Sequence, residues 1–200
     1  MQLPLFAQPN GQAAFDPQFR ALERTQLGLG AWIERAPNWV EHDAALFREL
    51  ERELDWRSEK RAMYTRVVVV PRLLASVPSR GLVEAMRAAL SQRYGEDFVH
   101  VTAALYRDGR DSVAFHGDTT ARTMNEAIVA TVSLGGARKF LVKPMEGGTS
   151  RSFQLGGGDL VVMGGTCQRT HRHAIPKVAR AEPRIALMFR PSWASGYKAP

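Results

Sequence analysis

From Phe98 to the end of the chain, short apolar runs alternate with glycine-rich turns, and this alternation limits the possible folds more than any other feature. Two runs, "FVHVTAALY" and "SVAFH", flank the turn Asp108-Gly109. The stretches "AIVATVSLGGARKFLVKP" and "SFQLGGGDLVVMGG" each predict a hairpin about their glycines, and "RIALMFRP" closes the series. The pattern predicts about seven short strands joined by tight turns.

Two helices are predicted ahead of these strands. The stretch 42–56 places apolar residues on one face, with Asp43 as a candidate cap, and the stretch 80–95 is a second amphipathic helix that ends at Gly95. Between them, "RVVVVPRLLASVPS" (66–79) is a β-branched run broken by Pro71 and Pro78. Helices followed by a series of strands predict an α+β fold with helices packed on a barrel or sandwich, and not alternating βαβ units.

Residues 1–40 are of mixed composition and are predicted to be an N-terminal arm or loosely structured cover, with one domain over 41–200. The first ten residues have neither the basic segment nor the long apolar segment of a secretory signal, and the longest apolar run, around 67–70, is too short to span a membrane. Cys167 is the single cysteine, so we expect a reducing, cytoplasmic location.

The chain carries 27 Lys and Arg against 20 Asp and Glu, a net charge of +7. This excess favours an acidic partner, with nucleic acid first, because cations neutralise phosphates. A set of basic residues could bind such phosphates or simply form a solvated surface: Arg72, Arg138, Lys139, Arg169, Arg172 and Lys177.

Two segments carry candidate metal ligands. In "AFHGDTT" (114–120), His116 and Asp118 point the same way if the backbone is extended, although a hydrogen-bonded turn would give the same pair. In "THRHAIP" (170–176), His171 and His173 share a face, although the segment could also be a polar surface strand. Two histidines and one carboxylate together can form the facial triad of Fe(II) oxygenases.

The strand "RIALMFR" (184–190) alternates two faces that both carry apolar residues, which predicts burial on both sides. Arg184 and Arg190 share one of these faces, and a buried guanidinium needs an anionic partner. A bound dicarboxylate would serve. Acids of the protein, or solvent at an edge strand, are the alternatives.

In this order and spacing, His116-x-Asp118, His173-Ala-Ile-Pro and Arg184-x5-Arg190 resemble the AlkB family of 2-oxoglutarate- and Fe(II)-dependent dioxygenases. The similarity runs over about 42–191 and includes "LYRDGRDSVAFH" and "VSLGGARKF". The resemblance implies a double-stranded β-helix (a jelly roll) with helices packed outside. It also implies an enzyme that uses Fe(II), 2-oxoglutarate and O2.

The resemblance further implies a role for each matching residue. His116, Asp118 and His173 would bind the iron, while His171 would lie near the mouth of the site. Tyr106 and Arg184 would bind 2-oxoglutarate, and Arg190 would lie close to its near carboxylate and to the reaction centre.

The implied reaction is oxidative dealkylation of N-alkylated bases in DNA or RNA, releasing formaldehyde, succinate and CO2. The partner would therefore be DNA or RNA with alkylated bases, and no membrane is expected. The sequence does not determine the oligomeric state; a monomer is favoured.

Four departures from the family pattern concern the substrate and the co-substrate. Thr119 and Thr120 stand where the nucleic-acid dealkylases carry acids, and His171 stands where they usually carry Trp, so these three residues are the candidate substrate pocket. Ala104 and Ala186 replace asparagines that hydrogen-bond 2-oxoglutarate or lie beside it. Ser76-Val77 replaces an aromatic pair that stacks on the base.

Three other hypotheses remain open on the sequence. The same oxygenase chemistry could act on a protein side chain or a small metabolite, for which the two threonines and the missing aromatic pair speak. The chain could instead be a catalytically silent or weak nucleic-acid-binding module. A zinc hydrolase is the third, although two arginines on one buried face have no evident task in it.

Overall fold

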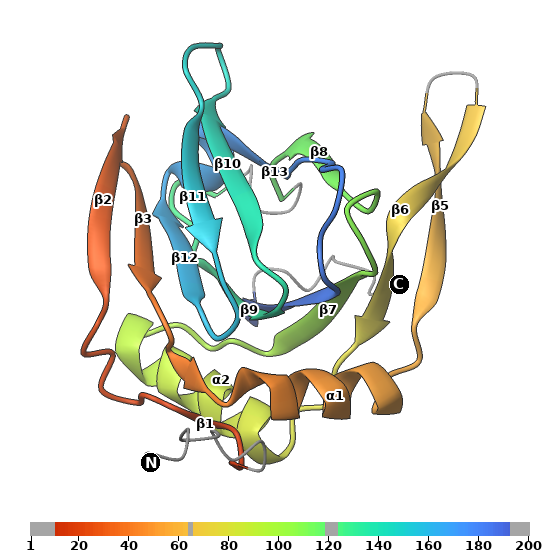
Figure 1. Ribbon diagram of the computed structural model, residues 1–200. Coiled ribbons are helices and arrows are strands. Elements are labelled where there is room, and N and C mark those ends of the chain that lie inside the picture. Colours follow the sequence, from red (N-terminus) through yellow and green to blue (C-terminus); the bar gives the residue numbers. More distant parts are fainter. Residues whose placement is uncertain (1–10, 64–65, 119–123, 193–200) are drawn as a thin grey trace, which may run out of the picture.

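The computed structural model describes residues 11–63, 66–118 and 124–192, without the side chains of 60–69. Its main feature is an eight-stranded antiparallel sheet in the order β2-β3-β12-β9-β14-β7-β6-β5 (Figure 1). A four-stranded antiparallel sheet, in the order β11-β10-β13-β8, lies across from it. We call these the large sheet and the small sheet.

The strands of the large sheet, in that order, are Glu23–Gly28, Ala31–Ala36, Leu160–Gly165, Val129–Gly135, Arg184–Arg190, His100–Tyr106, Arg66–Ser76 and Arg57–Met63. Those of the small sheet are Arg151–Leu155, Arg138–Pro144, His171–Ile175 and Val113–His116. The short strands β1 (Ala14–Phe15) and β4 (Val40–Glu41) pair with each other, and the helices are α1 (Asp43–Glu53), α2 (Gly81–Tyr94) and α3 (Cys167–Thr170).

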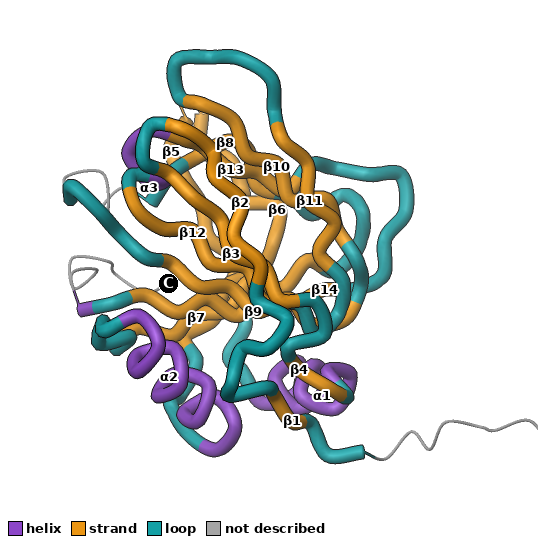
Figure 2. The backbone as a smooth tube through the Cα atoms, turned by 90° about the vertical axis from the view of Figure 1, so that its left-hand side faces the viewer, coloured by secondary structure: helices purple, strands orange, loops and turns teal. Residues whose placement is uncertain are grey.

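Apolar side chains cover both faces of the large sheet. On one face, Leu105 of β7 and Leu187 of β14 join the core that packs under α1 and α2. On the other face, Ala104 and Ala186 join the core between the two sheets. Figure 2 shows both helices lying below β7 and β9, away from the small sheet. The predicted burial of the last strand on both faces is therefore confirmed, and so is the prediction of helices outside a strand-rich core.

The two predicted hairpins are wrong, although their strands are right. β9 pairs with β12 and β14, whereas the following β10 pairs with β11 and β13, so the turn at Gly135-Gly136 carries the chain from the large sheet to the small one. The turn after β11 carries it back to β12. Glycine-rich turns allow either geometry, and the partners are chosen by burial, which local sequence does not report.

The N-terminal segment is not a loose cover over the described residues. β3 pairs along its whole length with β12, and β2 pairs with β3, so two strands of the large sheet come from within residues 1–40. The positions of Ile33 and Ala36, both fully buried, show that this segment contributes to the core. Its scattered prolines and glycines lie mostly between the strands, where they conceal the strand pattern.

The helices lie where they were predicted, with one correction at the start of α1. Asp43 makes no capping hydrogen bond. Its Oδ2 instead accepts the backbone N–H of Gly135, at 2.7 Å, which ties α1 to the end of β9. α2 ends as predicted, at Gly95 with φ +67°.

Pro71 does not break its strand. β6 continues from Arg66 to Ser76, and the register with β5 shifts between Ser58 and Lys60, opposite the proline. A bulge leaves one residue outside the ladder, so the missing N–H of a proline is tolerated there. Within the described residues, no helix is long and apolar enough to cross a membrane.

Gly158 lies in the turn between β11 and β12, which carries the chain from the small sheet back to the large sheet. A substitution there tests how closely this turn is packed. Gly158 has φ +82°, and a Cβ would lie 2.2 Å from the carbonyl oxygen of Val40. We expect Gly158→Ala to lower the free energy of unfolding, measured by urea titration, by at least about 1–3 kcal/mol. Gly156→Ala is the control, because a Cβ there meets nothing nearer than 3.6 Å. Equal midpoints for the two variants would contradict this packing.

Candidate functional site

A cavity of about 60 Å³ opens between the two sheets and collects most of the predicted site residues. It receives side chains from β7 and β14 of the large sheet and from β8, β10 and β13 of the small sheet. Its polar lining residues are Arg72, Tyr106, His116, Asp118, Thr131, His173, Arg184 and Arg190. The three motif segments, at 116–118, 173 and 184–190, therefore meet at one cavity.

His116 and His173 are held side by side by strand pairing. They face each other in the register of β8 and β13, and their ring centroids are 4.3 Å apart. Nδ1 of His116 donates to the carbonyl of Ala114 at 2.9 Å, which leaves Nε2 of that ring as the unprotonated nitrogen. Burial lowers the pKa of His116, and burial together with the nearby His116 lowers the pKa of His173 to about 3. Both imidazoles are therefore neutral at neutral pH, the form that binds metals.

Asp118 follows β8 by two residues and points at Arg190 from the large sheet. Nε of Arg190 donates to its Oδ2 at 2.7 Å. Burial acts to raise the pKa of Asp118, but the charge and hydrogen bonds of Arg190 outweigh it and hold this pKa below its ordinary value. Its backbone N–H donates to Oε1 of Gln168 at 3.1 Å. The cavity thus contains an ionised carboxylate next to two neutral imidazoles.

As the side chains stand, no three His, Cys, Asp or Glu residues in the described ranges are arranged closely enough to hold a metal ion. The Asp118 carboxylate is engaged by Arg190 rather than turned to the histidines. The donor set itself, two neutral nitrogens and one carboxylate on one cavity, fits Fe(II). A metal ion would draw the carboxylate away from part of its contact with Arg190.

Arg184 lies deeper in the same cavity and is almost completely buried, at 1% exposure. Its Nε donates to Oγ of Ser133 at 2.8 Å, and its guanidinium carbon lies 5.3 Å from the ring centroid of Tyr106. Its Nη1 has no hydrogen-bond partner in the described part of the chain. Because a buried cation with an unsatisfied N–H is costly, this end of the cavity is built for an anion.

Arg190 is held at the other end of β14. Besides Asp118, its Nη1 donates to Oγ1 of Thr102 at 3.1 Å. The two arginines project from the same face of one strand, as the sequence predicts, and both line the cavity. Ala104 and Ala186, two of the departures from the family pattern, lie directly opposite each other in the pairing of β7 with β14. Both of them line the cavity.

Three predicted substrate residues lie elsewhere or cannot be placed. His171 does not line this cavity; it borders a second one with Leu27 and Arg151, and its Nδ1 lies 2.8 Å from Oγ1 of Thr170. The prediction that it packs near the mouth of the iron site is therefore not what the structure shows. Thr119 and Thr120 lie outside the described residues.

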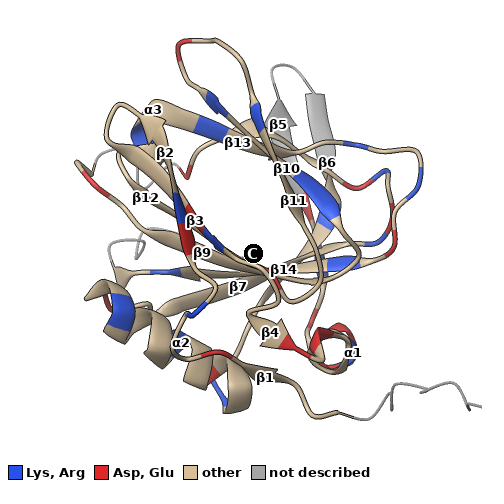
Figure 3. Ribbon diagram, turned by 60° about the vertical axis from the view of Figure 1, so that its left-hand side comes forward, with Lys and Arg blue, Asp and Glu red and all other residues tan. Residues whose placement is uncertain are grey.

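Sequence reasoning missed two buried polar residues that support the site, Ser133 beneath Arg184 and Gln168 beside Asp118. No motif marks either residue; a serine within a mostly apolar central strand was the one available signal. It also placed Arg138 among the exposed phosphate-binding candidates, whereas this residue is 1% exposed. Lys139 and Arg172 are exposed as expected, on β10 and β13, where Figure 3 shows basic positions along the small sheet.

Comparison with known proteins identifies the family. A sequence model of the 2OG-Fe(II) oxygenase superfamily matches residues 18–190. The chain belongs to this superfamily. The match begins well before residue 41, in agreement with the N-terminal strands of the large sheet.

The relatives place the chain in the AlkB branch of the superfamily. It is 32% identical over 143 residues to the uncharacterized protein R406 of Acanthamoeba polyphaga mimivirus, covering 70% of this chain and 72% of that protein. It is 27% identical to the human alpha-ketoglutarate-dependent dioxygenase alkB homolog 3, covering 68% of this chain but only about half (49%) of the human protein. It is 25% identical to the mouse DNA oxidative demethylase ALKBH2, over 72% and 73% of the two chains.

The solved structure of OsALKBH1 has the same fold, with a TM-score of 0.59 at 13% identity, covering 83% of this chain and 100% of the other. As a member of the 2OG-Fe(II) oxygenase superfamily, this protein is a 2-oxoglutarate-dependent dioxygenase that uses Fe(II), 2-oxoglutarate and O2.

The unpaired nitrogen of Arg184 gives a test that needs no activity. Because the free protein buries an incompletely paired cation, Arg184→Met is expected to leave the free energy of unfolding unchanged or raise it by up to about 2 kcal/mol. With Mn(II) present, 2-oxoglutarate at a hundred times its dissociation constant should stabilise the parent by about 2.7 kcal/mol and the variant far less. Arg20→Met, at an exposed pair, is the control. Full stabilisation of the Arg184 variant would contradict an anion site here.

Proposed function

We propose that this AlkB-family oxygenase oxidatively removes alkyl groups from N-alkylated bases of DNA or RNA. The observation that carries the proposal is that one cavity holds two neutral imidazoles and a carboxylate together with a guanidinium, that of Arg184, which is incompletely paired in the described structure. The name of the mouse relative, a DNA oxidative demethylase, and the +7 charge support a nucleic-acid substrate. The strand crossings between two facing sheets support a double-stranded β-helix as the fold.

In this proposal His116, Asp118 and His173 hold Fe(II). The neutral histidines need lose no proton to bind, because burial already keeps them deprotonated. Arg190 keeps Asp118 ionised and fixes its orientation from behind. With iron, 2-oxoglutarate and O2 bound, the cofactor set supplies the oxidation of a C–H bond, coupled to conversion of 2-oxoglutarate into succinate and CO2.

Arg184 and Tyr106 bind the distal carboxylate of 2-oxoglutarate. The guanidinium is fixed by Ser133 through Nε, and Nη1 is left without a partner in the described structure, available to the carboxylate. Such pre-organisation lowers the cost of ordering the site when the anion enters. The apolar wall, with Ala104, Ala186 and Phe140, excludes water from the space between the two charged ends.

Hydroxylation of an N-methyl group gives an N-hydroxymethyl group, whose C–N bond then breaks to release formaldehyde and the unmodified base. The protein supplies position and a dry cavity for this step. A second candidate substrate class, a protein side chain or small metabolite, is favoured by Thr119 and Thr120 in place of acids and by Val77, which is 8% exposed and packs in the core instead of offering an aromatic surface.

The two histidines of β13 provide a matched pair for the iron site. His173→Ala should reduce conversion of 2-oxoglutarate to succinate by at least about 100-fold, because a metal ligand is lost, and should abolish tight Mn(II) binding in calorimetry. His171→Ala, two residues earlier on the same strand, should retain both within about threefold, since it borders a different cavity. Loss of Mn(II) binding in both variants, or in neither, would reject this ligand assignment.

The substrate class is tested by formaldehyde release. We expect N-methylated single- and double-stranded oligonucleotides, of DNA and of RNA, to give formaldehyde in a one-to-one ratio with succinate, and free methylated nucleosides to react more slowly because they lack phosphates. Activity on oligonucleotides should fall as salt rises. Succinate formation with peptides or metabolites, but no formaldehyde from any methylated oligonucleotide, would sink the dealkylase proposal while leaving the oxygenase intact.

A further inference from the structure

Arg138 is a buried cation that the proposed reaction does not use. It projects from β10 toward the inside of the molecule and is 1% exposed. Its Nη1 donates to the carbonyl of Asp108 at 3.2 Å, and its Nη2 donates to the carbonyls of Asp111 and Pro176 at 2.8 and 2.6 Å. All of its hydrogen bonds in the described structure therefore end on backbone oxygens, and Nε has no partner there. Burying a full positive charge on backbone carbonyls calls for a reason.

The neighbour of this charge is the tyrosine of the co-substrate pocket. The guanidinium carbon of Arg138 lies 5.6 Å from the ring centroid of Tyr106, and that of Arg184 lies 5.3 Å from the same centroid. One aromatic ring therefore contacts two guanidinium groups. Arg184 lines the cavity, whereas Arg138 lies behind the tyrosine and does not.

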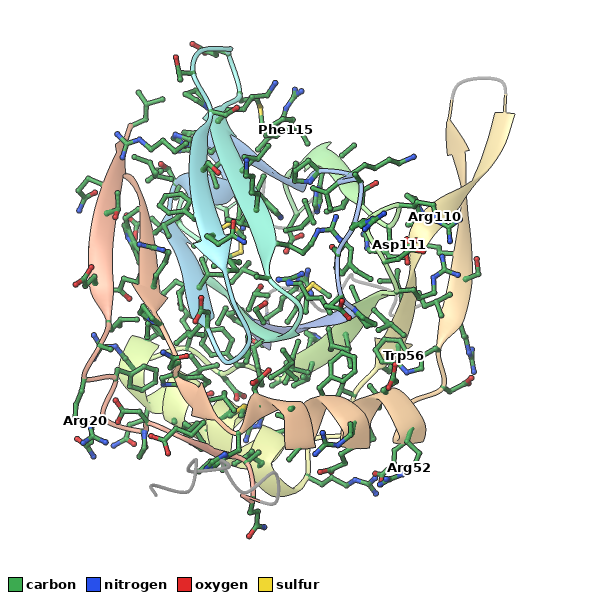
Figure 4. The ribbon with its side chains drawn as sticks, viewed as in Figure 1. Arg20, Arg52, Trp56, Arg110, Asp111 and Phe115 are labelled. Carbon is green, nitrogen blue, oxygen red and sulfur yellow. The ribbon has the colours of Figure 1, made fainter. Side chains whose placement is uncertain are left out.

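The carbonyls that Arg138 binds belong to the segments that carry the site. Asp108 and Asp111 lie in the turn that follows Tyr106, and Pro176 lies three residues after His173. These segments also meet where the N–H of Val178 donates to the carbonyl of Gly109 at 2.8 Å. Figure 4 shows Arg110 and Asp111 of the same turn lying beside β6. Arg138 thus fixes the backbone on which Tyr106 is mounted.

The charge of Arg138 also reaches the pocket. It repels the charge of Arg184, and this repulsion adds to burial in lowering the pKa of Arg184. Two like charges within a low-dielectric wall disfavour the empty pocket and favour a dianion, because each unit of negative charge is then attracted by both. A single arginine would provide less of this attraction.

From these contacts we propose that Arg138 is a positioning residue for 2-oxoglutarate: it orients Tyr106 from behind and supplies the second positive charge that the distal carboxylate meets. The inference rests on the proposed function, which assigns Tyr106 and Arg184 to that carboxylate. It goes further by placing part of the co-substrate affinity in a residue that never touches the co-substrate.

Three substitutions separate the charge from the hydrogen bonds. Arg138→Met removes both, Arg138→Gln keeps a short donor without charge, and Arg138→Lys keeps the charge without the planar fork. Arg107→Met is the matched control: Arg107 holds the same turn from outside, through a bidentate pair with Asp111, with its side chain 54% exposed. That variant disturbs the turn and leaves the buried charge in place.

The measurements are the KM and kcat for conversion of 2-oxoglutarate to succinate without a second substrate, and calorimetric binding of 2-oxoglutarate to the Mn(II)-loaded protein. We expect Arg138→Met and Arg138→Gln to raise KM and the dissociation constant on the order of tenfold, with kcat changed less than about threefold. Arg138→Lys should recover most of the affinity, and Arg107→Met should leave it within about twofold.

Two results would overturn the proposal. If Lys, Gln and Met all weaken binding equally, or if Arg107→Met weakens it as much, then only the integrity of the turn matters. If none of the Arg138 variants changes binding, the residue has no role in it. The Lys–Gln comparison decides the question should the Met variant fold poorly. Arg184→Met separates a failure of the proposed function from a failure of this inference. If Arg184→Met leaves binding of 2-oxoglutarate unchanged, the proposed function itself is rejected. If Arg184→Met abolishes this binding while the Arg138 variants retain it, only the inference about Arg138 is rejected.

Discussion

The ion pair between Arg190 and Asp118 joins the two sheets at the point where the chemistry is placed. One partner comes from the central strand β14 of the large sheet and the other from the segment that follows β8 of the small sheet. Both side chains are nearly buried, so neither charge is tolerated without the other. The ionised state of the carboxylate and its present orientation both depend on this contact.

Charge balance then organises the rest of the cavity. Along β14 the sequence places a guanidinium at each end of one face, with Ala186 and Met188 between them. The outer guanidinium is neutralised by a protein acid, whereas the inner one has a nitrogen without a partner in the described structure and a further guanidinium close behind Tyr106. The fold thus leaves positive charge at the Arg184 end of the cavity, where an anionic ligand from solution can balance it.

Much of this could be predicted from the sequence, because alternation along a strand is a local property. The pattern of apolar and polar residues correctly predicted the two faces of 184–190, the two helices and the strands after residue 98. It could not predict which strands pair, since a glycine turn permits both a hairpin and a crossing between sheets, and β3 could be recognised only by its distant partner β12. The same limit explains Asp43, whose partner Gly135 lies 92 residues away.

Within the site, the motif residues on β8, β13 and β14 do come together on one cavity, and their roles as ligands remain predictions. His171 shows why spacing alone was insufficient. The family resemblance implied a place near the mouth of the site, and alternation gave it a shared face with His173, but the two residues border different cavities. Arg138 shows the opposite case. An arginine next to a lysine in a strand is expected to be exposed to solvent, and only the packing of the turn at 108–111 reveals that Arg138 is buried.

The strands β2 and β3 bear on how this protein can be shortened. A variant that begins at residue 41 would keep every motif residue of the oxygenase, yet it would remove the whole partner of β12 on one side. The backbone groups of an apolar strand, buried throughout, would then form an open edge. Such edges recruit strands from other molecules, so the truncated chain would be prone to self-association even though its catalytic residues are all present.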